Sequence, residues 1–288
     1  MTIEETLRHA RQVLADNNIE DAPLEAEVLL RHALQVSRVQ LYLELDRQLD
    51  SAIAETFRHL IERRLAGEPT AYITGHREFY GLDFYVDCNV LIPRPESELL
   101  VEKALKLARN RPVITIADIG TGSGALAISL ALNLPQARIY ATDISPAALR
   151  VALFNCQQHN VENQVCLLAG DMLEPLPEPV DLIVANLPYV KEAELRKVNT
   201  LNFEPSLALN GGASGLEKIR PLFRQINNKL NPGGSVLIEI GQGQSEALVS
   251  LLETQFPSAG ITVTADLAGI KRVVSLTLPM FAHAPLSS

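Results

Sequence analysis

The first part of the chain carries apolar residues at helical spacing. Thr2 and Glu5 have the spacing of a capping box, in which each side chain bonds to the other residue's backbone. An apolar helix face begins at Leu7, and three further helices are predicted before Gly67. This pattern predicts a helical domain over residues 1–74. The expected N-terminal caps are Thr2, Asp21, Ser37 and either Asp50 or Ser51.

Residues 75–96 have a different character, because glycine, proline and aromatic residues become frequent. Tyr80-Gly81 and Asp87-Cys88-Asn89 are typical of turns, and the residues flanking them are typical of short strands. We therefore expect a β-hairpin linker over residues 75–96.

Strand patterns alternate with helical patterns over residues 97–288. Such alternation predicts an α/β, Rossmann-like fold with a mostly parallel sheet covered on both faces by helices. The last two strands have no helix between them, so they should pair antiparallel. The long segment 188–215 shows no regular pattern, which in a compact domain is typical of a functional loop. The expected strands cover 113–118, 138–142, 164–169, 181–185, 236–240, 261–265 and 272–278, and the expected helices begin near 97, 125, 145, 216 and 246.

Composition and charge narrow the classes of function. Lys and Arg number 25 against 34 Asp and Glu, giving a net charge of −9, whereas binding to a nucleic-acid backbone favours excess basic charge. The three cysteines and six histidines show no metal-ligand spacing, so no metal site is expected. No apolar run approaches the ~20 residues of a membrane span, and the first residues lack a signal-peptide core. We expect a cytoplasmic protein that does not bind membranes and is a monomer.

A glycine-rich turn between the first strand and its helix is the first candidate site. Glycines allow a sharp turn and a close approach of a ligand to the backbone amides. Asp143 ends the next strand, where an acidic residue binds the two hydroxyls of a ribose. The turn also satisfies the dinucleotide pattern G-x-G-x-x-A, so both features predict a nucleoside-containing cofactor without identifying it. The residues of the turn are Gly120, Thr121, Gly122, Ser123 and Gly124.

The sequence Asn186-Leu187-Pro188-Tyr189 follows the fourth strand, at the edge where open α/β sheets bind ligands. Methylation of a planar amide or amine nitrogen needs neutral acceptors that hold its N–H groups while positive charge develops. The Asn186 side-chain oxygen and the Leu187 carbonyl are such acceptors. Pro188 holds Leu187 extended, and Tyr189 offers a flat face to the planar group. These residues are the candidate catalytic and substrate-binding residues.

These motifs resemble those of S-adenosylmethionine-dependent class I methyltransferases that modify planar amino groups. The block GHREFYGLDFYVDCNVLIPRPESE, residues 75–98, is similar to the linker of the HemK/PrmC family, the glutamine-N5 methyltransferases of peptide chain release factors. Residues 203–216, which contain Phe-Glu-Pro-Ser-Leu-Ala-Leu, resemble the segment that follows the family's Asn-Pro-Pro-Tyr motif. Leu187 stands where the family usually has proline.

The resemblance implies a role for each candidate residue. Residues 120–124 would line the methionine and ribose of S-adenosylmethionine, with S-adenosylhomocysteine as product, and Asp143 would hold the ribose hydroxyls. Asp171 and Met172 would lie by the adenine, and Asn186 would touch both cofactor and substrate. Residues 186–189 would clamp the glutamine of a Gly-Gly-Gln motif in a release factor. Residues 1–74 would recognise that substrate, and residues 97–288 would form the methyltransferase domain.

Two other functions remain open at this point. Asn-Leu-Pro-Tyr also occurs in ribosomal-RNA adenine dimethyltransferases, so methylation of adenine N6 in RNA or DNA is the alternative. Those enzymes lack the 75–98 block and are typically basic. A nicotinamide-dependent oxidoreductase would use the same G-x-G-x-x-A turn, and it is distinguished by its cofactor.

Overall fold

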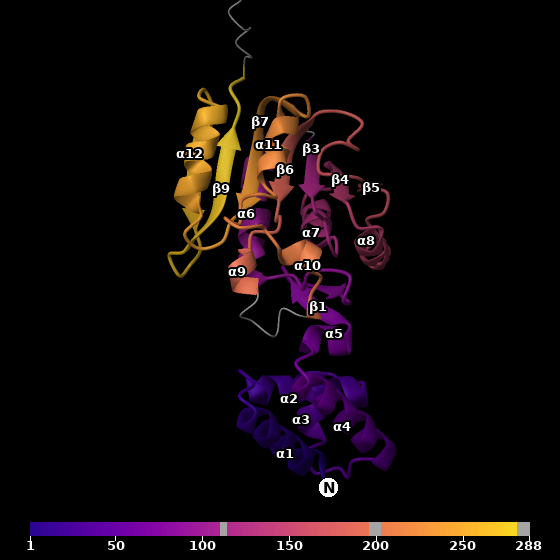
Figure 1. Ribbon diagram of the computed structural model, residues 1–288. Helices are drawn as coiled ribbons and strands as arrows, with labels where there is room; N and C mark the ends of the chain where they lie inside the picture. Colours follow the sequence, from indigo (N-terminus) through magenta and orange to yellow (C-terminus); the bar gives the residue numbers. More distant parts are fainter. Residues whose placement is uncertain (110–113, 196–202, 281–288) are drawn as a thin grey trace, which may run out of the picture. The chain divides into compact units, whose positions relative to one another are not determined.

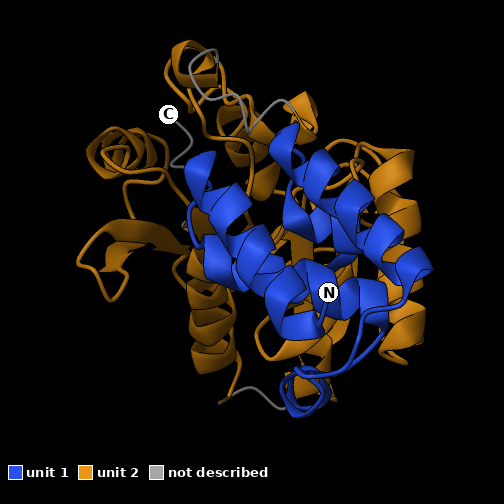
Figure 2. Ribbon diagram, turned by 90° about the horizontal axis from the view of Figure 1, so that it is seen from below, with its two compact units in different colours: residues 1–76 blue, residues 77–288 orange. Residues whose placement is uncertain are grey.

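The computed structural model describes residues 1–109, 114–195 and 203–280 (Figure 1). The chain divides into two compact units, residues 1–76 and residues 77–288 (Figure 2). Each unit has hydrophobic clusters of its own: one in the first unit and two in the second.

The first unit consists of helices. Its predicted caps at Thr2 and Ser37 are confirmed as complete capping boxes, and the Asp50 carboxylate accepts from the amides of Ala52 and Ile53. Asp21 also precedes a helix but has a left-handed φ of 53° and makes no side-chain cap bond. The helices are α1 (Ile3–Asp16), α2 (Ala22–Leu34), α3 (Arg38–Leu43), α4 (Ser51–Leu65) and α5 (Thr70–Thr74).

The second unit begins with a two-stranded hairpin, as predicted. Strands β1 (His76–Phe79) and β2 (Leu82–Tyr85) are joined by Tyr80 and Gly81, whose φ angles of 53° and 72° are those of a tight hairpin turn. Phe79 and Phe84 are buried and pack edge to face, with ring centroids 6.2 Å apart. They join the cluster formed by α6 and α7, which ties the hairpin to the larger sheet.

The main sheet has seven strands in the order β5-β4-β3-β6-β7-β9-β8. The strands from β5 to β7 pair in parallel, and β9 is antiparallel to both neighbours. This confirms the expected sheet with its antiparallel last strand. The strands are β3 (Thr115–Ile119), β4 (Arg138–Asp143), β5 (Val165–Ala169), β6 (Val180–Ala185), β7 (Leu230–Glu239), β8 (Gly260–Ala265) and β9 (Lys271–Thr277).

Alternate residues of each central strand face opposite layers of helices. In β6, Leu182 and Val184 pack in the cluster with α6 and α7, whereas Ile183 and Ala185 pack in the cluster with α11 and α12. These layers flank the sheet in Figure 1. The helices are η1 (Pro95–Ser97), α6 (Glu98–Ala108), α7 (Ala125–Asn133), α8 (Pro146–Gln158), α9 (Glu192–Leu195), α10 (Ser206–Leu209), α11 (Arg220–Ile226) and α12 (Ser245–Gln255).

The helix predicted from residue 216 to 230 is wrong in its extent. The α-helix covers only Arg220–Ile226, and Leu230 already pairs with Val180 as part of β7. The Asn231 side chain donates to Asp181 at 2.9 Å, and the Gly233 amide donates to the Pro279 carbonyl at 3.0 Å. These partners are distant in the sequence, so local periodicity could not indicate them. The start of the predicted strand at residue 113 lies outside the described residues.

Candidate active site

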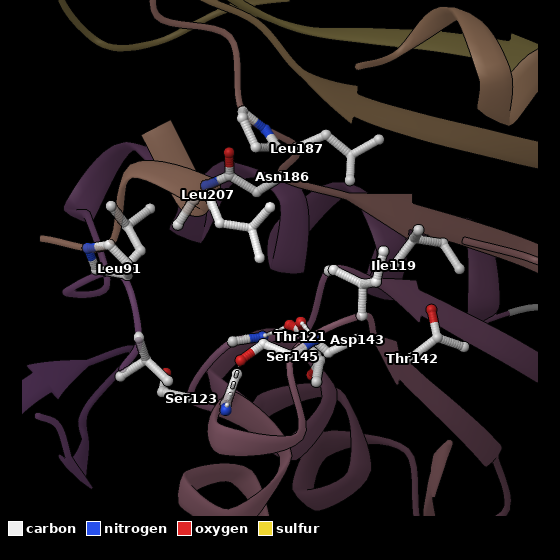
Figure 3. Close-up of a pocket in the computed structure, with 18 of the residues that line it drawn as sticks. Leu91, Ile119, Thr121, Ser123, Thr142, Asp143, Ser145, Asn186, Leu187 and Leu207 are labelled. Carbon is white, nitrogen blue, oxygen red and sulfur yellow. Dashed lines mark hydrogen bonds between the residues drawn. The ribbon is translucent and has the colours of Figure 1, made fainter. Parts of the chain in front are cut away.

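A cavity of about 380 Å³ lies at the carboxyl ends of the parallel strands in the second unit. It is lined by residues that follow β3, β4, β5 and β6, together with residues of the linker and of α10. Figure 3 shows Asn186, Leu187 and Leu207 on one side of the pocket and Thr121, Ser123, Asp143 and Ser145 on the other. A cavity is therefore present at the edge of the sheet where the sequence predicted a ligand site.

The turn between β3 and α7 needs its glycines. Gly120, Gly122 and Gly124 have φ angles of 72°, 56° and 82°, in the left-handed region that favours glycine. A Cβ on Gly120 would lie 3.2 Å from Cδ2 of Leu187, so the turn and the 186–188 segment are in close contact. The amides of Gly120 and Thr121 both donate to the Thr142 carbonyl at 2.9 Å. Of the five predicted turn residues, residues 120–123 line the cavity and Gly124 does not.

Asp143 ends β4 and lines the same cavity. Its carboxylate accepts from the Gly122 amide at 2.9 Å and from the Ser145 amide at 2.8 Å, which holds both oxygens in place. Burial raises the pKa of this carboxyl group, and the backbone hydrogen bonds act in the opposite direction. Each carboxylate oxygen has more than one acceptor position, so the group can still receive hydroxyl donors from a ligand.

Asp171 and Met172 follow β5 and also line the cavity. Met172 has a φ of 52°, a left-handed conformation that a non-glycine residue adopts uncommonly, and the next amide, that of Leu173, donates to Gln225 at 2.8 Å. Ile144 is exposed and lines the cavity beside Asp143. An acidic group flanked by apolar side chains and a glycine-rich backbone fits a nucleoside, with the ribose at the acid and the base between apolar walls.

Asn186, Leu187 and Pro188 line the cavity directly after β6. The Asn186 side-chain nitrogen donates to the Ser97 hydroxyl at 2.8 Å. Its nitrogen is therefore engaged with the protein, and its oxygen is the group left for an incoming donor. Leu187 is buried with only 6% of its surface exposed.

Tyr189 is not among the residues that line the cavity. Its hydroxyl donates to Glu239 at 3.1 Å, and its carbonyl accepts from the Gln244 side chain at 2.8 Å. Burial and the neighbouring Glu239 carboxylate raise the pKa of the Tyr189 hydroxyl. The side chain of Tyr189 is thus part of the wall behind the site in this structure.

Several residues around the site were not predicted from the sequence. Ser97 lines the cavity, and Glu239 lies behind it. Arg94 pairs with the buried Glu204, which also accepts from the Ile92 amide at 3.3 Å and so links the linker to the segment before α10. In the sequence, Arg94 and Glu204 both stand beside prolines, in the blocks Pro-Arg-Pro-Glu-Ser and Phe-Glu-Pro. Nothing in these blocks indicates that the two residues, 110 positions apart, form an ion pair.

Asp118, the residue before the end of β3, is fully buried beneath the turn. The Thr121 hydroxyl donates to it at 2.6 Å. Burial raises the pKa of Asp118 to about 7, with the nearby Asp143 acting in the same direction and the Thr121 hydrogen bond opposing it. Within the described ranges, no cluster of three His, Cys, Asp or Glu side chains is placed to hold a metal ion.

Comparison with known proteins shows which family models and relatives this chain resembles. Residues 5–75 match the family model of the PrmC N-terminal domain, and residues 111–267 match a methyltransferase domain. A protein of Moorella thermoacetica named release factor glutamine methyltransferase is 44% identical, and the match covers 94% of this chain and 97% of that protein. A protein of the same name from Geobacter sulfurreducens is 39% identical over 95% of both chains. The chain belongs to the release factor glutamine methyltransferase family.

Solved structures agree with this family at the level of the fold. The catalytic domain of hMettl16 superposes with a TM-score of 0.58 at 17% identity, covering 79% of this chain and 84% of that one. A methyltransferase from Pyrococcus furiosus gives a TM-score of 0.52 at 18% identity and covers 76% of this chain and 97% of that chain. The predicted class I methyltransferase fold is confirmed. No helix in the described part of this family member has the length and apolarity to cross a membrane.

Proposed function

We propose that this protein transfers a methyl group from S-adenosylmethionine to the side-chain amide nitrogen, N5, of a glutamine in peptide chain release factors. One observation carries the proposal. The glycine-rich turn, Asp143 and Asn186 meet in one cavity of a chain whose nearly full-length relatives bear the name of that reaction. We place the glutamine in a Gly-Gly-Gln motif, as the resemblance of the 75–98 block implies.

The residues of the cavity fit S-adenosylmethionine, which supplies an activated methyl group on a sulfonium when bound. Asp143 offers carboxylate oxygens to the ribose hydroxyls, and Ile144 and Met172 offer apolar walls to the adenine. Gly120 leaves the backbone open, because a Cβ there would press on Leu187. Asp171 also lines the cavity and, like Met172, is proposed to lie by the adenine.

Asn186, Leu187 and Pro188 are proposed to hold the target amide during the transfer. The Asn186 oxygen and the Leu187 carbonyl would each accept one N–H of the glutamine, which turns the nitrogen lone pair toward the methyl group. The bound S-adenosylmethionine would supply the methyl group, and the Asn186 oxygen and the Leu187 carbonyl, as neutral acceptors, would stabilise the positive charge that develops on the amide nitrogen. The methylated nitrogen then loses one proton to water. An N-protonated amide is so acidic that this step needs no dedicated base.

The remaining parts of the chain receive roles in the same proposal. Residues 1–74 recognise the release factor, residues 75–96 form the hairpin linker, and residues 97–288 form the methyltransferase domain. The independent hydrophobic cluster of the first unit supports a separate recognition role, since none of the cavity residues belongs to it. A substrate of the translation machinery also suggests that the protein acts in the cytoplasm.

The proposal is tested with methyl-labelled S-adenosylmethionine and three substrates: a release factor, the same release factor with its motif glutamine changed to alanine, and ribosomal RNA. Label on the first substrate alone is the expected result. Label on ribosomal RNA instead would establish the alternative adenine N6 activity. A ligand that binds only the native state raises its stability. Thermal stabilisation by S-adenosylhomocysteine but not by NAD would therefore exclude an oxidoreductase and leave the glutamine and the adenine methyltransferase as the two possible functions.

A further inference from the structure

The segment of residues 203–211, which contains α10, is attached to other parts of the site near both of its ends. Near its start, the buried Glu204 pairs with Arg94 of the linker. Near its end, the Leu209 carbonyl accepts from the Val190 amide at 3.1 Å. Val190 directly follows the candidate catalytic residues in the chain. The middle of the segment is therefore held in place between the linker and the strand end that carries those residues.

Leu207 lies between these two attachments with its side chain exposed. It keeps 54% of its surface accessible, whereas Leu209, two residues further on, is buried. A single exposed leucine on a protein surface is common, but Leu207 lines the cavity. In Figure 3 its side chain points into the cavity from the side that also carries Asn186 and Leu187. A fixed apolar side chain at this position is available to contact a ligand that enters the cavity.

The structure of a glutamine side chain gives a reason for an apolar group beside Asn186. Two methylene groups separate the amide of a glutamine from its backbone. When the amide is held by the Asn186 oxygen and the Leu187 carbonyl, these methylene groups must lie on the same side of the cavity. The cofactor is proposed to lie on the opposite side, over the glycine-rich turn and Asp143. Contact between the methylene groups and Leu207 would remove both from water and so favour the bound state.

We propose that Leu207 is a substrate-contact residue, which packs against the methylene groups of the target glutamine and keeps its amide at Asn186. The inference rests on the proposed function, because the glutamine is the substrate assigned there. Leu207 and Asn186 then have different tasks. Asn186 acts on the charge that develops at the nitrogen, whereas Leu207 acts on the orientation of the side chain that carries this nitrogen.

The kinetic test uses release factor and a short Gly-Gly-Gln peptide as substrates. Leu207→Ala should lower kcat/KM for both roughly tenfold, the size expected when contact with a methylene group is lost. Leu207→Met keeps the apolar volume and should retain kcat/KM within about threefold. Leu132→Ala is the matched control and should leave kcat/KM unchanged. Leu132 is also an exposed leucine on a helix, α7, but it is not among the described residues that line the cavity.

Binding of S-adenosylhomocysteine distinguishes a contact with the substrate from a contact with the cofactor. In Leu207→Ala its Kd, measured by calorimetry, should stay within about twofold of the wild-type value, which also shows that the variant folds. A Kd that rises as much as kcat/KM falls would place Leu207 in the wall of the cofactor site and overturn the proposal. Wild-type kcat/KM in Leu207→Ala would overturn it as well.

A second readout does not depend on the reaction. In protein labelled with ¹³C at the leucine methyl groups, the Leu207 signals are assigned by their loss in Leu207→Ala. With S-adenosylhomocysteine and the Gly-Gly-Gln peptide both bound, nuclear Overhauser effects should connect these methyl groups to the γ-methylene protons of the peptide glutamine. Effects that connect them only to S-adenosylhomocysteine would overturn the proposal.

The failure of this inference differs from the failure of the proposed function. A wild type that labels ribosomal RNA and not release factor would defeat the proposed function, and the role of Leu207 with it. A wild type that methylates release factor, with Leu207→Ala equally active, would defeat only the role of Leu207.

Discussion

Asn186 combines two features that the chemistry requires in one side chain. Its nitrogen is engaged by Ser97 inside the protein, and its oxygen is available at the cavity. Both features depend on the side chain being an amide, because an amide carries N–H donors and a neutral oxygen acceptor on the same carbon. A carboxylate would lack the N–H that donates to the Ser97 hydroxyl, and an apolar residue would leave that hydroxyl without this partner.

We predict that Asn186→Ala reduces methyl transfer by ~10²–10³-fold, because the lost oxygen acts on charge that develops in the transition state. Binding of S-adenosylhomocysteine should be largely retained, since Asp143 and the turn are untouched. Steady-state kinetics and calorimetry measure the two effects. Asn133→Ala, an asparagine at the end of α7 away from the cavity lining, should leave both unchanged. A nearly wild-type rate in Asn186→Ala would show that another group holds the amide.

Asp118 makes stability depend on pH. Its pKa in the folded protein is about 7 against an ordinary 3.8, so between these values the folded protein holds a proton that the unfolded chain has lost. The free energy of unfolding therefore falls as the pH rises from about 4 to about 7. Asp118→Asn keeps an oxygen for the Thr121 hydroxyl and removes this loss.

We predict that Asp118→Asn gains stability over the wild type by about 1 kcal/mol more at pH 8 than at pH 6, a window in which the wild-type group ionises. Urea unfolding at the two pH values measures the difference. Asp46→Asn, at an exposed position, should show no such change between the two pH values. An equal effect of Asp118→Asn at both pH values would mean that Asp118 ionises near its ordinary pKa.

At the scale of the elements, the contact between the β3–α7 turn and the segment after β6 shapes the site. The Leu187 side chain packs against Gly120. A Cβ placed on this glycine would lie 3.2 Å from Cδ2 of Leu187. The position of Leu187 is set by Pro188, which restricts the residue before it to extended conformations. The leucine side chain therefore packs inward, while its backbone carbonyl remains the group proposed to accept from the substrate.

We predict that Leu187→Pro, which restores the motif usual in the family, lowers kcat by less than about tenfold, equivalent to ~1.4 kcal/mol. Proline keeps the carbonyl, and its φ near −65° is compatible with an extended neighbour of Pro188. Initial rates on release factor measure the effect. Leu130→Pro, in the interior of α7, is the contrasting control and should unfold the protein. If Leu187→Pro were nearly inactive while still binding S-adenosylhomocysteine, the leucine side chain itself would shape the substrate pocket.

At the scale of the whole molecule, the chain consists of two units (Figure 2). Each unit has hydrophobic clusters of its own. We predict that a fragment of residues 77–288 folds and binds S-adenosylhomocysteine within about threefold of the full chain, since every residue that lines the cavity belongs to it. It should methylate a folded release factor much more slowly than the full chain does. Calorimetry and a labelled-methyl assay measure these two properties.

A short peptide containing the Gly-Gly-Gln motif is the control substrate for this fragment. The fragment and the full chain should methylate the peptide at similar rates, because the peptide needs only the cavity. Full activity of the fragment on folded release factor would refute a recognition role for residues 1–74.

The sequence by itself determined the features that depend on a few neighbouring residues. The caps at Thr2, Ser37 and Asp50, the Tyr80-Gly81 turn and the glycine turn before α7 follow from backbone geometry that only certain residue types allow. The alternation of strands and helices likewise follows from local periodicity, and parallel pairing then brings the strand ends together at one edge. The position of the cavity was therefore predictable.

Only the tertiary structure decided which distant groups meet. On α2, Leu24 is 52% exposed whereas the smaller Ala26 is buried, because the packing of α2 against its neighbours selects the face. Leu230 belongs to β7 because Val180 pairs with it across the sheet. Ser97 and Asn186 are 89 residues apart in the sequence and share a hydrogen bond. Such contacts depend on packing and on the satisfaction of buried polar groups over the whole fold, which no local pattern encodes.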